Sequence, residues 1–359
     1  MKIIALTKYD TLGASSRMRF DQYIKRFVKT EIDVLVEPLI SNDILKFKYD
    51  NGVYSFRSII KSYANRILVM LTINKYDLVW IEKEALPWMP LWFENIFLKN
   101  CKYVLDFDDA TFHDYDQHRL KLVRFVFGKR IDGLMKQSSL VVAGNNYLAK
   151  RAKKSGANNI HVIPTVIDIN RYKVKENIPD TYSESLPSIV WIGSPSTVSY
   201  LYLIKDALIN LAKRHNFILK VIGANPIKID GVNIKKIKWS EDTEISNLVT
   251  SDIGIMPLND SSWERGKCGY KIIQYMACGL PSVASAVGAN IEILNSPSVG
   301  FLASSQEDWE TALDLLLSDQ KLRIAIGIKA RERIEARYCI QKTEADLKNL
   351  LFKVSKGVI

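Results

Sequence analysis

Short, uninterrupted runs of β-branched and other apolar residues recur along the chain, with helix-like segments between them. In the first half these runs cover residues 3–6, 78–81, 103–107, 140–143 and 161–163. Uninterrupted runs, as opposed to alternating ones, are typical of parallel strands that are covered on both faces. Strands that alternate with helices predict parallel sheets joined by crossover helices.

A second series of runs follows the polar stretch 168–187, which is rich in charged residues and contains two prolines, so it predicts a linker. The runs of this series cover residues 189–192, 217–222, 232–239, 252–256, 281–284 and 300–303. A chain of 359 residues can form two cores. We therefore expect an α/β protein with two doubly wound, Rossmann-like domains that face a cleft, residues 1–167 and 188–339. A last helical pattern covers residues 332–354.

Composition limits the compartment and the partners. The apolar run at the start is too short for a secretory signal, no stretch is long enough to span a membrane, and the four cysteines show no paired spacing. These features favour a cytoplasmic protein with reduced thiols. The net charge is +11, and residues 1–170 hold 26 basic against 18 acidic residues. Such a basic surface suits binding to nucleic acid, to an anionic membrane or to phosphorylated substrates. The alternative is a basic surface with no dedicated partner. Nucleic-acid-binding motifs are absent.

Three turns after expected strands have features of phosphate-binding loops. Ligands of open parallel sheets bind where strands run into helix N-termini. The first turn holds Gly13, Ala14 and Arg17, and the second holds Gly193, Ser194, Ser196 and Thr197. Neither matches a P-loop or a Gly-x-Gly-x-x-Gly fingerprint, which argues against a dinucleotide dehydrogenase. Each of these two turns alone is more often a plain strand-to-helix connection.

The third turn, residues 263–271, runs into an apolar helical pattern that Gly279-Leu280-Pro281 ends. If the helix begins near Gly269, the side chains of Lys267, Lys271 and Gln274 share one exposed face at its N-terminus. Backbone N–H groups and two lysines would then meet a single anion, and Gln274 could bond to a ribose hydroxyl. The alternative is a solvated helix start with incidental lysines.

At these residues the chain resembles the GT-B glycosyltransferases, and within them the retaining glycosyltransferase family 4. Residues 162–168, 251–258 and 276–281, the last followed by Gly288, carry the resemblance, which covers nearly the whole chain. The resemblance implies a donor site mainly in the second domain and a C-terminal helix, about residues 340–359, that returns to the first. It further implies a nucleotide diphosphate-sugar donor, with UDP or GDP, and no metal or other cofactor. The donor-binding candidates it adds are Trp239, Glu264, Gly269 and Tyr270.

The resemblance further implies a saccharide or lipid-linked saccharide acceptor and a role in assembling cell-surface polysaccharide or glycan. Two departures from the family pattern stand out. Gly266 and Gln274 occupy the places of two glutamates, and Glu264 is a possible substitute. Ser194 and Ser199 occupy the stretch that commonly holds an arginine and a lysine. Because a diphosphate leaving group gains negative charge, we hypothesise that Lys267 and Lys271 replace those cations.

An acidic loop follows the expected strand 103–107. In the resembled family this strand end faces the transferred sugar, so Asp108 and Asp109 are candidates to orient or deprotonate an acceptor hydroxyl. Asp106 and Asp108 also fit the Asp-x-Asp pattern of metal-dependent GT-A glycosyltransferases, which have one Rossmann-like domain. A loop of solvated carboxylates is the third possibility.

Basic and aromatic residues are interleaved in two segments, 46–75 and 119–130. This pattern suits peripheral contact with an anionic membrane, although helices that simply pack on the sheet would look similar. Glu82, Glu84, Trp88 and Trp92 could line a sugar site. Because the glutamate pattern is altered, a non-catalytic nucleotide-sugar-binding subunit remains an alternative to an enzyme.

Overall fold

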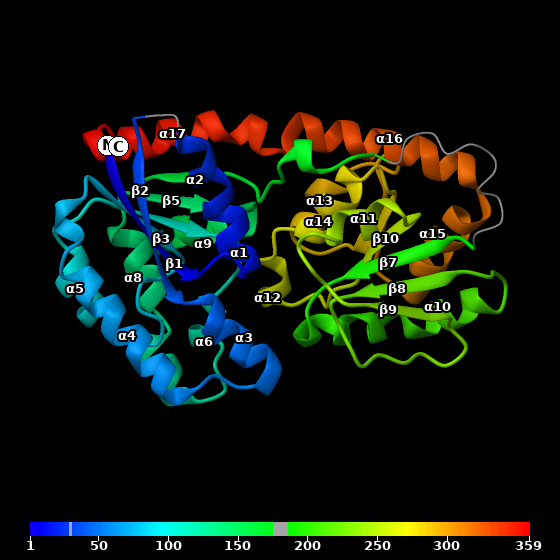
Figure 1. Cartoon of the computed structure of the whole chain (residues 1–359), viewed down its shortest axis with the longest axis horizontal. Helices are drawn as coiled ribbons and strands as arrows, with labels where there is room; N and C mark the ends of the chain where they lie inside the picture. Colours follow the sequence, from blue (N-terminus) through cyan, green and yellow to red (C-terminus); the bar gives the residue numbers. More distant parts are fainter. Residues whose placement is uncertain (29–30, 175–185) are drawn as a thin grey trace. The chain divides into compact units, whose positions relative to one another are not determined.

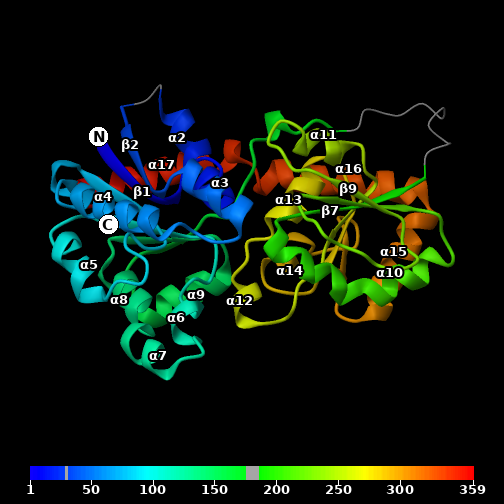
Figure 2. The same cartoon turned by 60° about the horizontal axis from the view of Figure 1, so that its bottom comes forward.

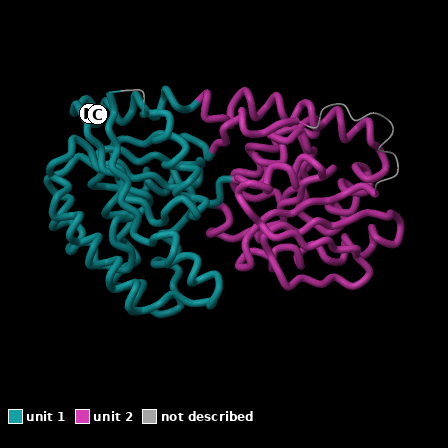
Figure 3. Tube along the Cα trace, viewed as in Figure 1, with its two compact units in different colours: residues 1–165, 266–268, 343–359 teal, residues 166–265, 269–342 magenta. Residues whose placement is uncertain are grey.

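A computed structural model describes residues 1–28, 31–174 and 186–359 of the chain. Each of its two compact units contains one six-stranded parallel sheet with helices on both faces (Figures 1 and 2). Unit 1 comprises residues 1–165, 266–268 and 343–359, and unit 2 comprises residues 166–265 and 269–342 (Figure 3). The structure thus confirms the α/β class and the two doubly wound sheets.

The sheet of unit 1 has the strand order β2-β1-β3-β4-β5-β6. Its strands are β1 (Lys2–Tyr9), β2 (Asp33–Ile40), β3 (Leu78–Glu82), β4 (Tyr103–Phe107), β5 (Leu140–Ala143) and β6 (Ile160–Val162). Its helical segments are α1 (Ala14–Ser16), η1 (Arg17–Asp21), α2 (Gln22–Phe27), α3 (Asn42–Asn51), α4 (Phe56–Met70), η2 (Ile73–Lys75), α5 (Leu91–Leu98), α6 (His113–Asp116), α7 (Lys121–Phe127), α8 (Arg130–Gln137) and α9 (Asn146–Ser155). The central strands β3, β4 and β5 are buried along their whole length, which explains their uninterrupted apolar runs.

Strand β2 is missing from the expectations above. It pairs with β1 alone, and its residues 33–38 include exposed and polar side chains. Pro38, opposite Thr7, interrupts the β pattern of the sequence. Proline has no N–H to donate to a neighbouring strand, so it is tolerated on an edge strand. An edge strand of this kind lacks the apolar signal that identifies the central strands.

The sheet of unit 2 has the strand order β12-β11-β10-β7-β8-β9. Its strands are β7 (Ser188–Ile192), β8 (Ile218–Ile222), β9 (Ile234–Ile237), β10 (Ile253–Met256), β11 (Ser282–Ser285) and β12 (Phe301–Ala303). Its helical segments are η3 (Ile169–Arg171), η5 (Pro195–Ile204), α10 (Lys205–Ala212), α11 (Glu244–Val249), α12 (Ser262–Arg265), α13 (Tyr270–Ala277), α14 (Ala289–Ile293), α15 (Gln306–Ser318) and α16 (Gln320–Arg337). Two apolar clusters cover its two faces. Val190 and Ile192 pack into one and Ile189 and Trp191 into the other.

The C-terminal helical pattern is not one helix. It comprises α16, which ends at Arg337, and α17 (Ile340–Lys356). Between them the chain pairs with Ile167, whose N–H donates to Tyr338 O at 3.2 Å and whose carbonyl accepts from Ile340 N at 2.8 Å. From Thr343 onward α17 belongs to unit 1, where the Thr343 hydroxyl lies 2.7 Å from Tyr23 Oη.

Of the expected linker 168–187, residues 175–185 lie outside the described residues. The described part begins with η3, capped by Asp168, and reaches the buried Tyr172. All four cysteines are free thiols. Among the helices in the described ranges, none is both long and apolar enough to cross a membrane.

Candidate functional site

In unit 1 the charged candidates gather at the carboxyl ends of β1, β3 and β4. The chain runs from β1 to β2 on one side and then to β3 on the other, so the sheet changes direction between β1 and β3. Such a switch point is where open parallel sheets bind their ligands. Ser15 and Ser16 follow β1, Lys83 follows β3, and Asp108 follows β4.

Lys83 occupies the centre of this group. Its ammonium lies 2.7 Å from Asp108 Oδ1 and 3.7 Å from Asp109 Oδ2, and it donates to Ser15 Oγ at 2.9 Å. Ser15 Oγ in turn donates to the other carboxylate oxygen of Asp108. Lys83 has a φ of +62°, in the left-handed region that is strained for a side chain with a Cβ. Such strain persists only where the surroundings enforce it, and it gathers at functional sites.

Burial and the neighbouring charges together shift the pKa values of Lys83, Asp108 and Asp109. Burial alone would lower the pKa of Lys83, but Asp108, Asp109 and Glu82 outweigh it and raise that pKa above its usual value. Burial would likewise raise the pKa of Asp108, yet the ammonium of Lys83 holds it below the usual range. For Asp109, burial and the Asp108 carboxylate raise the pKa, although Lys83 and Lys267 act against them. Lys83 and Asp108 are thus an ion pair at neutral pH.

Asp106 serves a different partner. Its Oδ1 accepts from Arg19 Nε at 2.7 Å, and Arg19 Nη1 also donates to Ile163 O at 2.8 Å. Both side chains are buried. Burial raises the pKa of Asp106 to about 6, although Arg19 opposes the shift.

The Asp-x-Asp interpretation of Asp106 and Asp108 does not fit the structure. The two carboxylates pair with Arg19 and Lys83 respectively, and two six-stranded sheets contradict the single Rossmann-like domain of GT-A enzymes. In the part of the chain that the structure describes, no three His, Cys, Asp or Glu side chains form a group that could hold a metal ion.

Residues 266–268 pack onto the acidic loop within unit 1. Asn145, which caps α9 by accepting from Leu148 N, donates from Nδ2 to Gly266 O at 2.9 Å and to Lys267 O at 3.1 Å. The thiol of Cys268 donates to Asp108 O at 3.1 Å. This arrangement places Lys267 in the electrostatic environment of Asp109.

The first glycine turn is held by hydrogen bonds within residues 10–17. The N–H of Gly13 donates to Asp10 O at 2.9 Å, so it is engaged within the turn. Ala14 begins α1, and the buried Arg17 donates from Nη1 to Thr11 O at 3.2 Å. A side chain at Gly13 would collide with Tyr9, because a Cβ there would lie 2.3 Å from Tyr9 Cβ. Gly13 is therefore required for packing.

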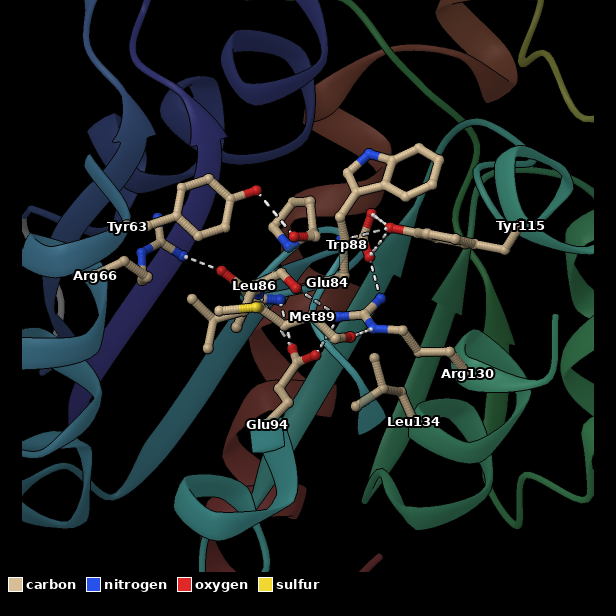
Figure 4. A network of polar contacts seen from close by, with 12 residues as sticks. Tyr63, Arg66, Glu84, Leu86, Trp88, Met89, Glu94, Tyr115, Arg130 and Leu134 are labelled. Atoms are coloured by element: carbon tan, nitrogen blue, oxygen red, sulfur yellow. Dashed lines mark hydrogen bonds and ion pairs between the residues drawn. The ribbon is translucent and has the colours of Figure 1, made fainter. Parts of the chain in front are cut away.

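The loop after β3 is held by a buried ion-pair network (Figure 4). Arg130 on α8 pairs with Glu84 and Glu94 and donates to Leu86 O at 2.8 Å. Glu84 also accepts from Tyr115 Oη at 2.7 Å. Burial raises the pKa of Glu94, and Arg130 opposes that rise.

The four residues considered for a sugar site therefore separate into two kinds. Glu84 is committed to Arg130 and Tyr115, and Glu82 is buried, where it accepts from Ser16 Oγ at 2.6 Å and Lys8 N at 2.8 Å. Trp88 and Trp92 are 47% and 67% exposed. The two indole rings alone present a surface on which a sugar ring could stack.

In unit 2 the second glycine turn follows β7 at the corresponding switch point, between β7 and β10. The Gly193 N–H donates to Ile222 O at 3.0 Å, and a Cβ on Gly193 would lie 2.5 Å from the Trp191 ring. Thr197 N donates to Ser194 O at 2.9 Å. The hydroxyls of Ser194 and Ser196 lie 2.8 Å apart at the surface.

Helix α13 begins next to Gly269, as the sequence indicates, and Gly269 has a φ of +68°. Lys271 is half-buried, with its ammonium 5.6 Å from the centre of the Trp191 ring. Gln274, however, is buried, and its amide donates to Tyr172 Oη at 3.1 Å. The expectation of one exposed face shared by Lys267, Lys271 and Gln274 is therefore wrong for Gln274.

The remaining donor-side candidates surround this helix start. The hydroxyl of Tyr270 lies 3.5 Å from that of Tyr172. Trp239, next to the carboxyl end of β9, donates from Nε1 to Glu244 at 2.9 Å. Glu264 on α12 is buried and accepts from Tyr200 Oη at 2.6 Å and from Ser261 Oγ.

Sequence reasoning missed Lys83 and Asn145. Lys83 lies between two glutamates and matches no known motif. Its position directly after a buried strand could have identified it as a candidate. Asn145 follows strand β5 and Gly144, and an asparagine at that place is a helix N-cap signature. Its second role, holding residues 266–268, depends on a contact with a segment 121 residues away.

Three comparisons bear on this arrangement. Residues 187–319 match the family model described as "Glycosyl transferases group 1". No sequence among the curated proteins matches the chain. Among solved structures, Alr3699/HepE from Anabaena in complex with UDP has a TM-score of 0.73 at 17% identity, covering 98% of this chain and 100% of that one.

Two further solved structures share the architecture. A glycosyltransferase from Rickettsia africae ESF-5 has a TM-score of 0.67 at 16% identity, with 98% of each chain covered. WaaG, a glycosyltransferase involved in lipopolysaccharide biosynthesis, has a TM-score of 0.66 at 17% identity, covering 97% of this chain and 99% of that one. Similarity at these identities establishes a common fold along the whole chain.

Proposed function

We propose that this chain, which has the GT-B fold and carries a glycosyl transferases group 1 domain at residues 187–319, is a glycosyltransferase that takes its sugar from a nucleoside diphosphate donor. The donor is a UDP- or GDP-sugar, and the acceptor is a saccharide or lipid-linked saccharide of a cell-surface polysaccharide or glycan. The transfer retains the anomeric configuration and uses no metal. Unit 2 binds most of the donor, and unit 1 binds the acceptor.

The match of residues 187–319 is the observation that carries the proposal. It covers both elements expected to meet the donor, the turn after β7 and the start of α13. Crystal structures of HepE with UDP, with UDP and glucose, and with UDP-glucose support a nucleotide donor for a protein of this fold. UDP-glucose is therefore the first donor to test.

The residues divide into two roles. Lys267 and Lys271 stabilise the negative charge that the diphosphate gains as the glycosidic bond breaks, because fixed cations are most effective where charge develops. Gly193, Ser194, Ser196, Thr197, Trp239, Glu264, Gly269, Tyr270 and Gln274 shape the donor side. Asp108 and Asp109 position the acceptor hydroxyl. Asp108 is paired with Lys83. The carboxylate of Asp109 takes up a proton more readily, since its pKa is raised by burial and by Asp108.

The direct test is the thermal stability of the protein with UDP, GDP, dTDP and CMP, each with and without EDTA. A ligand at about 100 times its Kd adds about 2.7 kcal/mol to the stability of the unit that binds it. Stabilisation by one nucleotide that EDTA does not change would support the metal-independent donor site. Stabilisation that vanishes with EDTA, or none with any nucleotide, would contradict the proposal.

A non-catalytic nucleotide-sugar-binding subunit is the second candidate, and the glutamate pattern favours it. Gly266 packs with its Cα against Ala110, where a Cβ would lie 2.4 Å from Ala110 Cβ, so a glutamate could not replace it without rearrangement. Turnover separates the two candidates. Release of UDP from UDP-sugar in the presence of acceptor would identify an enzyme, whereas nucleotide binding without release would identify the subunit.

A further inference from the structure

Helix α7 differs from the other helices of unit 1 that cover the sheet, because it buries none of its residues. Its side chains Leu122, Phe125 and Val126 are 72%, 88% and 48% exposed. The spacing of 122, 125 and 126 puts these three on one helix face. In Figure 2 α7 lies at the tip of unit 1, beyond α6 and α8. These three apolar side chains are thus presented to the solvent on one face of the helix.

The base of this tip packs against aromatic rings of unit 1. The ring of Phe127 lies 6.1 Å from that of Tyr115 and 6.3 Å from that of Trp88. Trp88 N donates to Tyr115 Oη at 3.0 Å, and Tyr115 is tied to the Glu84–Arg130 network. The C-terminal end of α7 is therefore connected to the buried network through Phe127.

The charged residues within the tip itself have one sign. The tip, residues 118–129, contains Arg119, Lys121, Arg124 and Lys129 and no acidic residue. Arg119, Lys121 and Lys129 are exposed. Arg130, which the sequence pattern groups with these cations, is excluded because it is buried in the ion-pair network. Exposed apolar side chains interleaved with cations complement a bilayer whose headgroups are anionic.

Helix α4 also exposes apolar side chains, but it fits this role less well. Phe56, Ile60, Leu68 and Leu71 along it are 78%, 54%, 62% and 64% exposed. Its other face, however, is buried along the helix through Ser62, Arg66 and Met70. Arg66 donates to Thr7 O and Glu37 O, both at 2.7 Å. Helix α4 is therefore a packed helix of the sheet with an apolar fringe.

We propose that the tip formed by residues 118–129 inserts into an anionic lipid bilayer, with Leu122, Phe125 and Val126 among the acyl chains and the four cations at the headgroups. This inference deepens the proposed function, because a membrane-bound enzyme would meet a lipid-linked saccharide at the bilayer surface. Only this link to the acceptor rests on the proposed function.

The test is co-sedimentation of the full chain with vesicles of phosphatidylcholine, with and without one quarter phosphatidylglycerol. We expect binding to the anionic vesicles, and weaker binding in about 0.5 M NaCl, where charges are screened. The double variant Leu122→Ser/Phe125→Ser should lower the partition coefficient at least about tenfold, because two inserted side chains are lost. Lys121→Gln and Lys129→Gln should each lower anionic binding roughly fivefold.

Two matched controls assign the effect to the tip. Ile324→Ser/Ile328→Ser removes two side chains that are 54% and 53% exposed on α16, and it should leave the partition coefficient unchanged. Phe56→Ser/Leu71→Ser removes the two most exposed apolar side chains of the α4 segment and should have less effect than the α7 variant. Equal binding to neutral and anionic vesicles, or loss in the α4 variant alone, would overturn the inference. So would a dimer that the α7 variant dissociates.

Nucleotide-dependent stabilisation of the same preparations separates the two proposals. An α7 variant that loses vesicle binding but is still stabilised by its nucleotide supports both. Wild-type protein that responds to a nucleotide but ignores the vesicles overturns the bilayer inference alone. Wild-type protein that binds the vesicles but no nucleotide contradicts the proposed function alone.

Discussion

The ammonium of Lys83 lies 2.7 Å from Oδ1 of Asp108, with only 5% and 12% of the two side chains exposed. Lys83→Met would leave the Asp108 carboxylate without its cation, and breaking a buried pair in this way costs about 3–5 kcal/mol. We expect urea unfolding to show a loss of this size. Lys25 forms an ion pair of the same length with Asp21 at the surface, with Lys25 70% exposed. Lys25→Met should change the free energy of unfolding by less than about 0.5 kcal/mol.

The same variant should change how stability depends on pH. In the wild type the folded-state pKa of Asp108 is lowered from 3.8, so its contribution is present above about pH 4 and is lost as the pH falls through the folded value. Without Lys83, burial raises that pKa, and the sign reverses. The deficit of Lys83→Met relative to the wild type should therefore shrink as the pH falls from neutral to below 3.8. A deficit that stays constant over this range would contradict the ion pair.

Arg130 presents a similar test with two carboxylates. Arg130→Met would leave Glu84 and Glu94 charged and buried, so we expect a loss of about 3–5 kcal/mol in the free energy of unfolding. The triple variant Arg130→Met/Glu84→Gln/Glu94→Gln should recover part of that loss, because no unpaired charge remains. Arg214 also meets two carboxylates, Glu310 and Asp314, but is 49% exposed. Arg214→Met should cost less than about 1 kcal/mol.

Local patterns predicted the strands of this protein well, because a central parallel strand is apolar on both faces wherever it lies in the sheet. They failed where a partner far along the chain decides the structure. The helical pattern 332–354 contains a break that depends on pairing with Ile167. Gln274 points inward because Tyr172, about a hundred residues earlier, accepts its hydrogen bond.

The candidate site shows the same limit. Asp108 was a candidate because it follows the strand 103–107, whose end faces the transferred sugar in the resembled family. Lys83 meets it only through the parallel pairing of β3 with β4, in which Glu82 lies opposite Asp106. The two lysines near α13 were expected to act on one face. Lys267 instead belongs to unit 1 and Lys271 to unit 2, a division that no helical periodicity could indicate.

Gly266 tests how residues 266–268 are held. A Cβ at this position would lie 2.4 Å from Ala110 Cβ and 2.8 Å from Ala110 N, so Gly266→Ala should displace the segment and cost about 1–3 kcal/mol. The Cys268 thiol, 8% exposed in the wild type, should then react faster with a thiol reagent. A Cys101→Ala background removes the more exposed cysteine, and adding Cys268→Ala should abolish the new signal. An unchanged reaction rate would show that the close packing of Gly266 on Ala110 does not hold the segment.

Lys267 and Lys271 test the chemistry itself. If they replace the cations that the family usually places near the diphosphate, Lys267→Ala and Lys271→Ala should each lower kcat by roughly 10²–10³, by analogy with the loss of one oxyanion donor. KM for the donor should change less, because the added negative charge exists only as the bond breaks. Stability should fall little, since both side chains are only half-buried. Lys321→Ala removes an exposed lysine of α16 and should keep wild-type turnover. Turnover of sugar from the donor identified by thermal stabilisation is the measurement, and unchanged kcat in both variants would rule out this role for the two lysines.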